Sequence, residues 1–369
     1  MIQYLKLGSL TRIRTGKLDA NAADDNGKYP FFTCSKEPLS INTCSYDCEC
    51  VLVAGNGDLN VKYYDGKFDA YQRTYIIESL DKIKLMVKYL YCFLDLYVEI
   101  LRQQAIGGVI KYIKLGNLAD AIIPVPVIEK QREIIEIFEK CNGTIAYRHQ
   151  ELLLMDQLVK SRFIEMFGDP KRNPRKWDMV TVGDIATDVR YGTSRPATEG
   201  GKYPYLRMNN LTYEGYLDLT DLKHIDIPDN EVEKCVVRNG DVLFNRTNNV
   251  ELVGKTCVYN LDSDMIIAGY IIRVRIDDRV LPVILSSYLN STVMKEQLRS
   301  MAKGAVNQAN INAQELRSIP IYLPPITLQH EFATFVEQVD KSKFYIIQMQ
   351  ILLRLLIRAI QQKTTEVLL

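Results

Sequence analysis

The chain has 369 residues, 47% of them hydrophobic and 25% charged, a composition typical of a globular protein with room for two or three domains. We find no apolar run of about 18 residues and no basic-then-apolar leader, and the eight irregularly spaced cysteines read as reduced thiols, so we expect a cytoplasmic protein with neither a membrane span nor a disulfide framework. The net charge is +1, and residues 1–128 carry 15 Lys+Arg against 14 Asp+Glu while residues 168–326 carry 20 against 20. No part of the chain is therefore a basic domain that binds phosphate backbones nonspecifically, and any nucleic-acid role must rest on local patches or on charge from a partner.

Residues 1–128, the first globe, are predicted to form short β strands bounded by Asn, Asp and Gly turns, for example at Cys48–Gly55 and Arg73–Ser79. A helical stretch near Leu85–Gln104 interrupts them. The spacing of Cys34, Cys44, Cys48 and Cys50 lacks the paired Cys-x2-Cys hooks of a tetrahedral zinc site. We therefore expect no metal here, since Cys48 and Cys50 would share one face of a strand as core thiols.

A long helix is predicted over Glu129–Phe167, the central helix of residues 129–167. Pro124 and Pro126 end the extended segment before it, and proline suits a helix entry because the first turn needs no N–H donor. Gly168-Asp169-Pro170 is a stop signal for this helix.

Residues 168–326, the second globe, begin with a linker at 168–177 that holds two prolines and four basic residues in DPKRNPRKW. Strands are predicted within Asp241–Thr247 and Met265–Ile276, and a helical stretch near Pro282–Met301. Residues 327–369 then carry a second long helix, predicted over Thr327–Glu366.

The chain repeats itself at an offset of 198, which places Pro126, Ile128 and Gln131 on Pro324, Ile326 and Gln329. An apolar stripe with alternating four-three spacing follows each entry in the same register. Such a stripe favours two long helices that pack on each other, although two separate helices packed on neighbouring domains would also show it. The predicted helix-pairing residues are Ile134, Phe138, Ile145, Leu152, Met155, Val159, Phe332, Val336, Val339, Ile346, Leu353 and Ile357.

With these features the chain resembles the specificity subunits of type I restriction-modification enzymes over nearly its whole length. The resemblance is carried by KYPFFTCSKEP, VLVAGNGDLNVKYYDGKFDAYQRTYII, IIPVPVIEKQREIIEIF, LLLMDQLVKSRFIEMFGDP and LRSIPIYLPPITLQ. It departs from the family in the Gly-Thr…Pro segment early in each globe. The second globe has this segment at Gly192–Pro196, but the first has only Thr15-Gly16-Lys17-Leu18.

The resemblance implies an α+β fold with two mixed α/β target recognition domains in an internal repeat, separated by two long helices packed as an antiparallel coiled coil. Each globe would read one half of a bipartite double-stranded DNA target. The helices would fix the spacing and dock two methyltransferase subunits, with restriction/translocase subunits bound to the same complex. The chain itself would be non-catalytic and carry no cofactor, and S-adenosylmethionine, ATP and Mg would act in the partner subunits.

Two rival functions are a catalytic methyltransferase or nuclease acting alone and a protein-binding scaffold. A methyltransferase needs a Gly-rich cofactor loop and an Asn/Asp-Pro-Pro-aromatic motif, and neither is found. Gly254-Lys255-Thr256 resembles part of a phosphate loop, but Asn249 stands where its first glycine would be. The three histidines, His149, His224 and His330, lie far apart in the sequence. We therefore predict no catalytic residues.

Polar loops in comparable places of both globes favour DNA contact over a pure scaffold. Arginine pairs with guanine, and Asn or Gln pairs with adenine, through two hydrogen bonds each. An ordinary Asn-capped turn would show the same residue types, so each residue has a structural alternative. The predicted DNA-binding residues are Lys17, Asn56, Lys62, Gln72, Arg73, Arg190, Thr193, Arg195, Arg207, Asn209, Asn210, Asn245, Arg246, Thr247, Asn248, Asn249 and Lys303.

Overall fold

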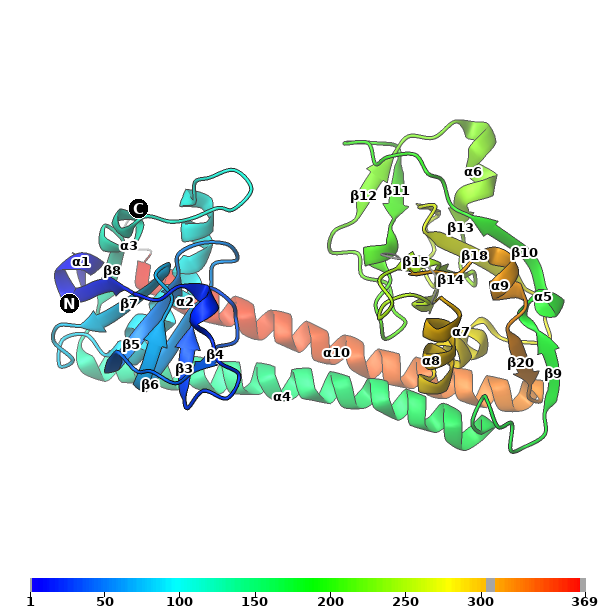
Figure 1. The fold of residues 1–369 in the computed structure, drawn as a ribbon, viewed down its shortest axis with the longest axis horizontal. Helices are drawn as coiled ribbons and strands as arrows, with labels where there is room; N and C mark the ends of the chain where they lie inside the picture. Colours follow the sequence, from blue (N-terminus) through cyan, green and yellow to red (C-terminus); the bar gives the residue numbers. More distant parts are fainter. Residues whose placement is uncertain (1, 303–308, 366–369) are drawn as a thin grey trace. The chain divides into compact units, whose positions relative to one another are not determined.

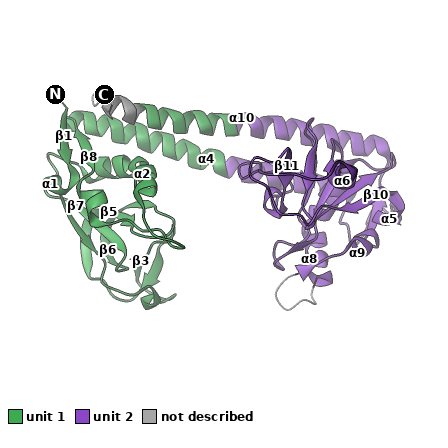
Figure 2. Cartoon of the chain, turned by 90° about the horizontal axis from the view of Figure 1, so that it is seen from above, with its two compact units in different colours: residues 1–149, 347–369 green, residues 150–346 purple. Residues whose placement is uncertain are grey.

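A computed structural model describes residues 2–302 and 309–365, and Figure 1 shows its elements. The chain divides into two compact units, coloured separately in Figure 2. Unit 1 comprises residues 1–149 and 347–369, and unit 2 comprises residues 150–346. Among the described residues, no helix is both long enough and apolar enough to cross a membrane.

Unit 1 is built on a six-stranded sheet in the order β2-β7-β5-β6-β3-β4, in which only the β3–β6 pair is parallel. Its strands are β2 (Thr11–Thr15), β3 (Tyr29–Phe32), β4 (Leu39–Ile41), β5 (Tyr46–Ala54), β6 (Val61–Ala70) and β7 (Thr74–Ser79). A separate antiparallel pair joins β1 (Gln3–Lys6) to β8 (Ile122–Val125). The helices of this globe are α1 (Leu7–Leu10), η1 (Ala20–Ala22), α2 (Val87–Gln104) and α3 (Leu115–Ala119).

The core of unit 1 lies on both faces of this sheet. Helix α2 packs on β5 and β6 and buries Leu90, Leu94 and Leu101 completely. The opposite face holds a smaller cluster in which Cys50 is fully buried and Cys48 is half-buried beside it. Both thiols therefore lie in the core of the sheet, as the alternation along β5 predicts.

Unit 2 repeats this plan with two four-stranded sheets, β10-β18-β14-β16 and β12-β11-β17-β13. The strands are β10 (Ala186–Tyr191), β11 (Tyr203–Leu206), β12 (Lys223–Ile225), β13 (Val236–Val237), β14 (Val242–Asn245), β16 (Thr256–Val258), β17 (Met265–Ile267) and β18 (Ile271–Ile276). Two short pairs join β9 (Asp178–Thr181) to β20 (Pro320–Leu323) and β15 (Thr247–Asn248) to β19 (Ala309–Asn310). The helices are α5 (Val182–Ile185), η2 (Met208–Asn210), α6 (Asp229–Cys235), α7 (Pro282–Asn290), α8 (Thr292–Met301) and α9 (Ala313–Arg317).

The strand pairings of the two globes correspond one to one at the centre of the fold. The parallel pair β3–β6 of unit 1 recurs as β11–β17 in unit 2, and the antiparallel pairs β2–β7 and β5–β7 recur as β10–β18 and β14–β18. The long strand β6, which carries Gly66 at φ +138°, is replaced in unit 2 by two strands, β16 and β17. That replacement divides the single sheet of unit 1 into two sheets in unit 2.

The predicted helix Pro282–Met301 is instead two helices, because the chain leaves helical geometry at Ser291. Its φ and ψ are −61° and 149°, and its hydroxyl accepts from the Met294 amide at 3.4 Å as the N-cap of α8. Serine favours such a cap over a helix interior. The single-helix prediction is therefore wrong in the second globe and correct for α2 in the first.

The two long helices are confirmed as α4 (Ile128–Phe167) and α10 (Ile326–Thr365). Gly168 follows α4 at φ +87°, where its amide donates to Ile164 O at 2.8 Å, so the predicted stop is a glycine in the left-handed region. Every residue of the predicted apolar stripe is buried or half-buried, whereas Leu153, Leu154 and Leu158 between the stripe positions are exposed.

Each unit contains its own contacts between the two helices. In unit 2, Phe332 of α10 packs its ring on Phe163 and Phe167 of α4, and Lys343 lies 2.5 Å from the Asp156 carboxylate. From the first contact to the second, the residue numbers increase along α10 and decrease along α4. The two helix segments therefore run antiparallel within unit 2. In unit 1, Gln350 donates to Ile145 O at 3.3 Å, and Ile357 joins the core of that unit.

One buried glutamine near the start of each long helix attaches it to its globe. Gln131 accepts from the Met86 amide at 2.9 Å and donates to Lys84 O and Pro126 O at 2.8 and 2.9 Å. Gln329 accepts from the Leu281 amide at 2.8 Å and donates to Arg279 O and Pro324 O at 3.0 and 2.8 Å. Both side chains are fully buried, and all these partners are backbone atoms. The repeated Pro-Ile-Gln spacing is therefore an attachment device as well as a helix entry.

Candidate nucleic-acid interface

In each unit, the loops after the two strands that flank β7 or β18 meet at the start of that strand, a place we call the loop edge. In unit 1 the Gly16 amide donates to Thr74 O at 3.0 Å and the Gly55 amide donates to Arg73 O at 2.8 Å. In unit 2 the corresponding bonds run from Gly192 to Ile271 O at 3.2 Å and from Arg246 to Tyr270 O at 2.9 Å. The same loops thus converge in both globes, although only the second has the Gly-Thr…Pro segment.

Close backbone approach explains why glycine occupies the first of these positions in both globes. A Cβ on Gly16 would lie 2.1 Å from Ala70 O, and a Cβ on Gly192 would lie 2.1 Å from Ile267 O. No larger residue fits without moving the strand beside it. The same close contact between a glycine and a neighbouring backbone carbonyl therefore shapes the loops of both globes.

In the first globe the predicted residues at this edge present mostly exposed side chains. The side chains of Lys17, Gln72 and Arg73 are exposed. The backbone N–H of Gln72 donates to Leu18 O at 2.9 Å, and this bond holds the two loops together. Asn56 follows Gly55 and is half-buried. Lys62 donates to Asn60 Oδ1, and burial lowers the pKa of its ammonium group below the usual value.

In the second globe, five of the predicted residues line one cavity of about 470 Å³. They are Thr193, Arg195, Arg207, Asn209 and Arg246. The remaining wall includes Pro196, Ala197, Met208, Ala268 and Tyr270. Residues from four separate loops thus surround one concave, partly apolar space.

Two of the three arginines in this cavity are held by carboxylates. Arg195 makes two bonds to Glu231, at 3.1 and 2.7 Å, and Arg207 lies 2.7 Å from the Asp221 carboxylate. Among the residues that the structure describes, no carboxylate lies within ion-pair distance of Arg246. The Arg246 guanidinium instead lies 4.7 Å from the centre of the Tyr191 ring. Of these three guanidinium groups, that of Arg246 is the one that no carboxylate of the described residues pairs with.

Several predicted contacts are buried supports of the loops, which revises their expected role. Asn245 is fully buried and donates to Thr247 O and Tyr270 O, both at 3.1 Å, while it accepts from Asn248 Nδ2 at 2.9 Å. Asn210, 2% exposed, accepts from the Arg207 amide and donates to Asp218 O. These amide groups are occupied by the chain itself, because a buried polar group needs such partners.

Two threonines and one asparagine have similar internal partners. Thr247 donates to Asn310 Oδ1 at 2.8 Å, and Thr193 accepts from the Arg195 amide at 3.2 Å. Asn249 is exposed, and its side chain accepts from the Leu252 amide at 2.9 Å. Asn209 is exposed at the rim of the cavity. Lys303 lies outside the described residues.

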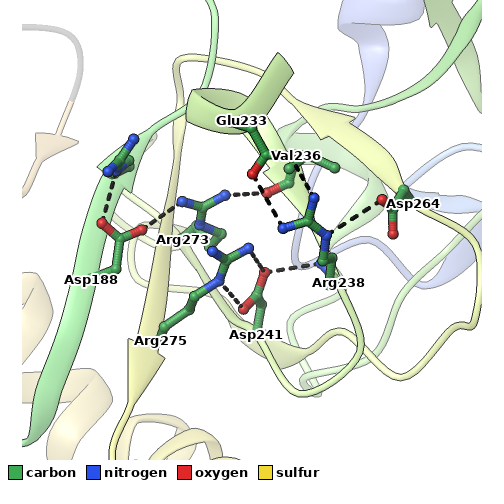
Figure 3. Close-up of polar contacts among 9 residues, drawn as sticks. Asp188, Glu233, Val236, Arg238, Asp241, Asp264, Arg273 and Arg275 are labelled. Carbon is green, nitrogen blue, oxygen red and sulfur yellow. Dashed lines mark hydrogen bonds and ion pairs between the residues drawn. The ribbon is translucent and has the colours of Figure 1, made fainter. Parts of the chain in front are cut away.

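Arg190 pairs with Asp188, which begins a chain of polar contacts between the two sheets of unit 2. Figure 3 shows this chain from Asp188 through Arg273 to Val236. Asp188 accepts from Arg190 at 2.8 Å and from Arg273 at 2.5 Å, and Arg273 also donates to Val236 O. Burial would raise the pKa of Asp188, but the bonds from the two arginines outweigh it and lower that pKa. The ionised Asp188 thereby pairs with Nε of the exposed Arg190 guanidinium.

Sequence reasoning missed the partners that shape this edge. Tyr191 lies under the Arg246 guanidinium, and Tyr270, half-exposed, supplies the carbonyl that accepts from the Arg246 amide. Glu231 and Asp221 pair with arginines 36 and 14 residues away in sequence. Tyr191 directly precedes the Gly-Thr segment, so the motif itself could have indicated it.

The described part of the chain was expected to hold no metal site and no phosphate loop, and two observations bear on these sites. No group of three or more His, Cys, Asp or Glu side chains there is placed to hold a metal ion. Lys255, in the sequence that resembles part of a phosphate loop, is 5% exposed and donates to Met208 O at 2.6 Å. Its ammonium group thus supports the neighbouring loop.

Comparison with known proteins gives matches along most of the chain. A family model described as the type I restriction modification DNA specificity domain matches residues 2–153 and 174–356. The EcoDI specificity subunit of Escherichia coli, a type I restriction enzyme subunit, is 38% identical over 156 residues, which are 42% of this chain and 34% of that protein. The EcoKI specificity subunit of Escherichia coli K12 is 22% identical over 260 residues, 66% of this chain and 56% of that protein. The chain thus spans between a third and just over half of these relatives.

Solved structures match over nearly the whole chain at low sequence identity. The S subunit of a type I restriction-modification system from M. genitalium aligns with a TM-score of 0.54 and 15% identity, covering 99% of this chain and 96% of its own. A chain from a type I system studied for complex assembly and conformational transition aligns with a TM-score of 0.55 and 18% identity, covering 98% and 97%. These alignments show a shared fold.

Proposed function

Because this chain belongs to the family of type I restriction-modification DNA specificity domains, we propose that it selects the DNA sequence on which a partner methyltransferase acts. Each globe would read one half of a bipartite target in double-stranded DNA. The observation that carries this proposal is the loop edge built twice by equivalent hydrogen bonds, at Gly16 and Gly55 in one globe and at Gly192 and Arg246 in the other. Two similar edges suit two separate half-sites.

The proposed interface uses the side chains that remain available at each edge. In the first globe these are Lys17, Gln72 and Arg73, and in the second they include Arg246 and Asn209. Arginine and amide side chains can each form two hydrogen bonds with a base edge, whereas lysine contacts phosphates without reading sequence. Arg190 is the proposed phosphate contact next to the second edge. The buried Asn210, Asn245, Thr193 and Thr247 would order the loops.

The long helices α4 and α10 are proposed to form an antiparallel coiled coil that fixes the spacing of the half-sites. Support comes from the heptad register of the apolar stripe and from the antiparallel contacts within unit 2. The helices would also dock two methyltransferase subunits, with restriction/translocase subunits in the same complex. S-adenosylmethionine, ATP and Mg would then be bound by those partners, and this chain would act without catalytic groups of its own.

The test is to map methylated bases in cells that carry this chain together with its partner methyltransferase, and in cells that carry either alone. The proposal expects one bipartite motif that appears only when both are present. Methylation by the chain alone would make it an enzyme. An unchanged pattern when the chain is deleted would remove its role in sequence choice.

A further inference from the structure

Arg246 is fixed at the wall of the 470 Å³ cavity in the second globe, and its surroundings indicate a specific ligand. Its amide donates to Tyr270 O and its carbonyl accepts from the Ile311 amide, both at 2.9 Å, so the backbone is held from both sides. Its guanidinium is stacked at 4.7 Å on the Tyr191 ring. A guanidinium held in this way is oriented before any ligand arrives, which reduces the entropy cost of binding.

The chemistry of the cavity favours a neutral acceptor over a phosphate. Glu231 and Asp221 already balance the charges of Arg195 and Arg207, so of the three arginines only Arg246 carries a charge that no carboxylate of the described residues balances. A phosphate would bring a further negative charge close to those two carboxylates, and their repulsion opposes its binding. The apolar wall of Pro196, Ala197, Met208 and Ala268 suits an aromatic ring instead.

Guanine is the base that matches these groups. Its O6 and N7 are two adjacent acceptors, and arginine donates to both in its commonest specific base contact. Tyr270, half-exposed at the cavity, offers a ring on which a base can stack. Among the described residues, no hydrogen bond joins the Arg246 guanidinium to the protein, and its buried Nε has no partner, so the two terminal nitrogens are the donors left for a ligand.

The shape of the site determines how the base must arrive. Arg246 is half-buried and lines a concavity, so it does not project as a groove-reading side chain would. A base in a stacked duplex cannot enter such a space unless it leaves the stack. We propose that the cavity receives a guanine of the second half-site turned out of the duplex, with Arg246 donating to its O6 and N7. This inference rests on the proposed function and adds the base and its mode of entry.

The experiment uses the complex of this chain with its partner methyltransferase and duplexes that carry the mapped motif. At each guanine of the second half-site in turn, the opposing cytosine is replaced by an abasic residue, and the dissociation constant is measured. A guanine opposite an abasic residue has no pairing partner and costs less to turn out of the duplex. The duplex with the abasic residue at one particular position should therefore bind at least about tenfold more tightly than the intact duplex. Substitution of 7-deazaguanine at that position should abolish the gain, because N7 is removed.

Variants then assign the effect to this cavity. Arg246→Ala and Arg246→Lys should both lose the gain, since lysine keeps the charge but not the two-pronged donor. Arg172→Ala, an exposed arginine of the linker, should keep it. For each variant, the affinity for the abasic duplex is divided by the affinity for the intact duplex. A general loss of protein stability lowers both affinities and leaves this ratio unchanged. Free guanosine monophosphate is titrated alone as a further arm.

Four outcomes would overturn the inference: a second half-site without guanine, no position with a gain, a gain that survives in Arg246→Ala, or saturation of the cavity by the free nucleotide alone. The proposed function fails separately, when no bipartite motif depends on the chain. A motif that is read normally with no gain at any guanine would leave sequence selection intact and remove only the turned-out base.

Discussion

Lys295 is a buried cation in the second globe. It is 4% exposed, its ammonium donates to Gly254 O at 2.9 Å, and it lies 4.9 Å from the centre of the Tyr213 ring. Burial, followed by the charges of Lys160, Lys255 and Arg299, lowers the pKa of Lys295 to about 7, while Glu214 opposes the shift. The folded protein therefore disfavours the charged form that the unfolded chain keeps up to about pH 10.5.

This difference predicts a stability that rises with pH. Between about pH 7 and pH 10 the unfolded chain binds a proton at Lys295 that the folded chain has lost, so the free energy of unfolding should increase by up to a few kcal/mol. Lys295→Met should flatten that rise, whereas Lys341→Met, an exposed lysine on α10, should not. Urea unfolding at a series of pH values measures both. Parallel pH curves for wild type and Lys295→Met would contradict the prediction.

At the loop that carries Asn245 and Arg246, the sequence predicts which residue types are present but not which way each side chain points. The loops that carry Asn245 and Arg246 were predicted as contact loops because their residue types can read bases. Sequence could not say that Asn245 would face inward with its amide fully bonded while its neighbour Arg246 lined a cavity. That distinction depends on Tyr270 and Tyr191, which adjoin the loop only after folding.

At the scale of elements, each long helix is joined to its globe through a glutamine that bonds only to backbone atoms. Gln131 and Gln329 use the same three-bond arrangement although the side chains around them differ. Because no partner side chain is required, globes of different sequence can be attached in the same way.

Removal of this glutamine should loosen one attachment at a time. Gln329→Met leaves the Leu281 amide and two carbonyls without partners, at a cost of about 1–3 kcal/mol for each buried group that water cannot reach. Amide hydrogen exchange should therefore accelerate at Leu281 but not at Met86, and Gln131→Met should do the reverse. Gln338→Met, an exposed position on the same helix, serves as the control. Equal exchange in all three variants would mean that the glutamines do not hold the globes.

Elements were predictable in proportion to the regularity of their patterns. The stripes of α4 and α10 repeat over 40 residues each, so the pattern predicts both ends of α4 and the start of α10 within one residue. The predicted end of the second helix at Glu366 lies outside the described residues. The break between α7 and α8 depends on one cap at Ser291 within an apolar pattern that continues, and periodicity alone does not detect it. The division of the second globe into two sheets depends on the β16–β17 connection, which the sequence presents as an ordinary turn.

At the scale of the whole molecule, the repeat predicts that the globes are independent readers. Each globe has its own core, with the clusters around Leu94 and Phe244 in different units. Exchange of residues 178–318 for the matching globe of another family member should change one half of the methylated motif only. Methylation mapping of the chimera measures this. A change in both halves would show that the globes read DNA together.

If the long helices set the distance between the half-sites, longer helices should increase that distance. Seven residues inserted in each helix, near Leu153 and near Ile351, preserve the heptad register, so the apolar stripes can still pair. At 1.5 Å per residue this adds roughly 10 Å. With base pairs about 3.4 Å apart, the methylated motif should gain up to about three unspecified pairs, and fewer if the helices cross the DNA axis obliquely.

Both half-site sequences should stay unchanged, because the insertions touch no globe residue. A four-residue insertion in α4 alone should reduce methylation, since it moves residues such as Leu152 and Val159 out of register with their partners on α10. Mapping the methylated motif in cells that express each variant gives the readout. If the gap stays the same while activity is full, the helices do not set the spacing, and their shared heptad register must serve the docking of the partner subunits instead.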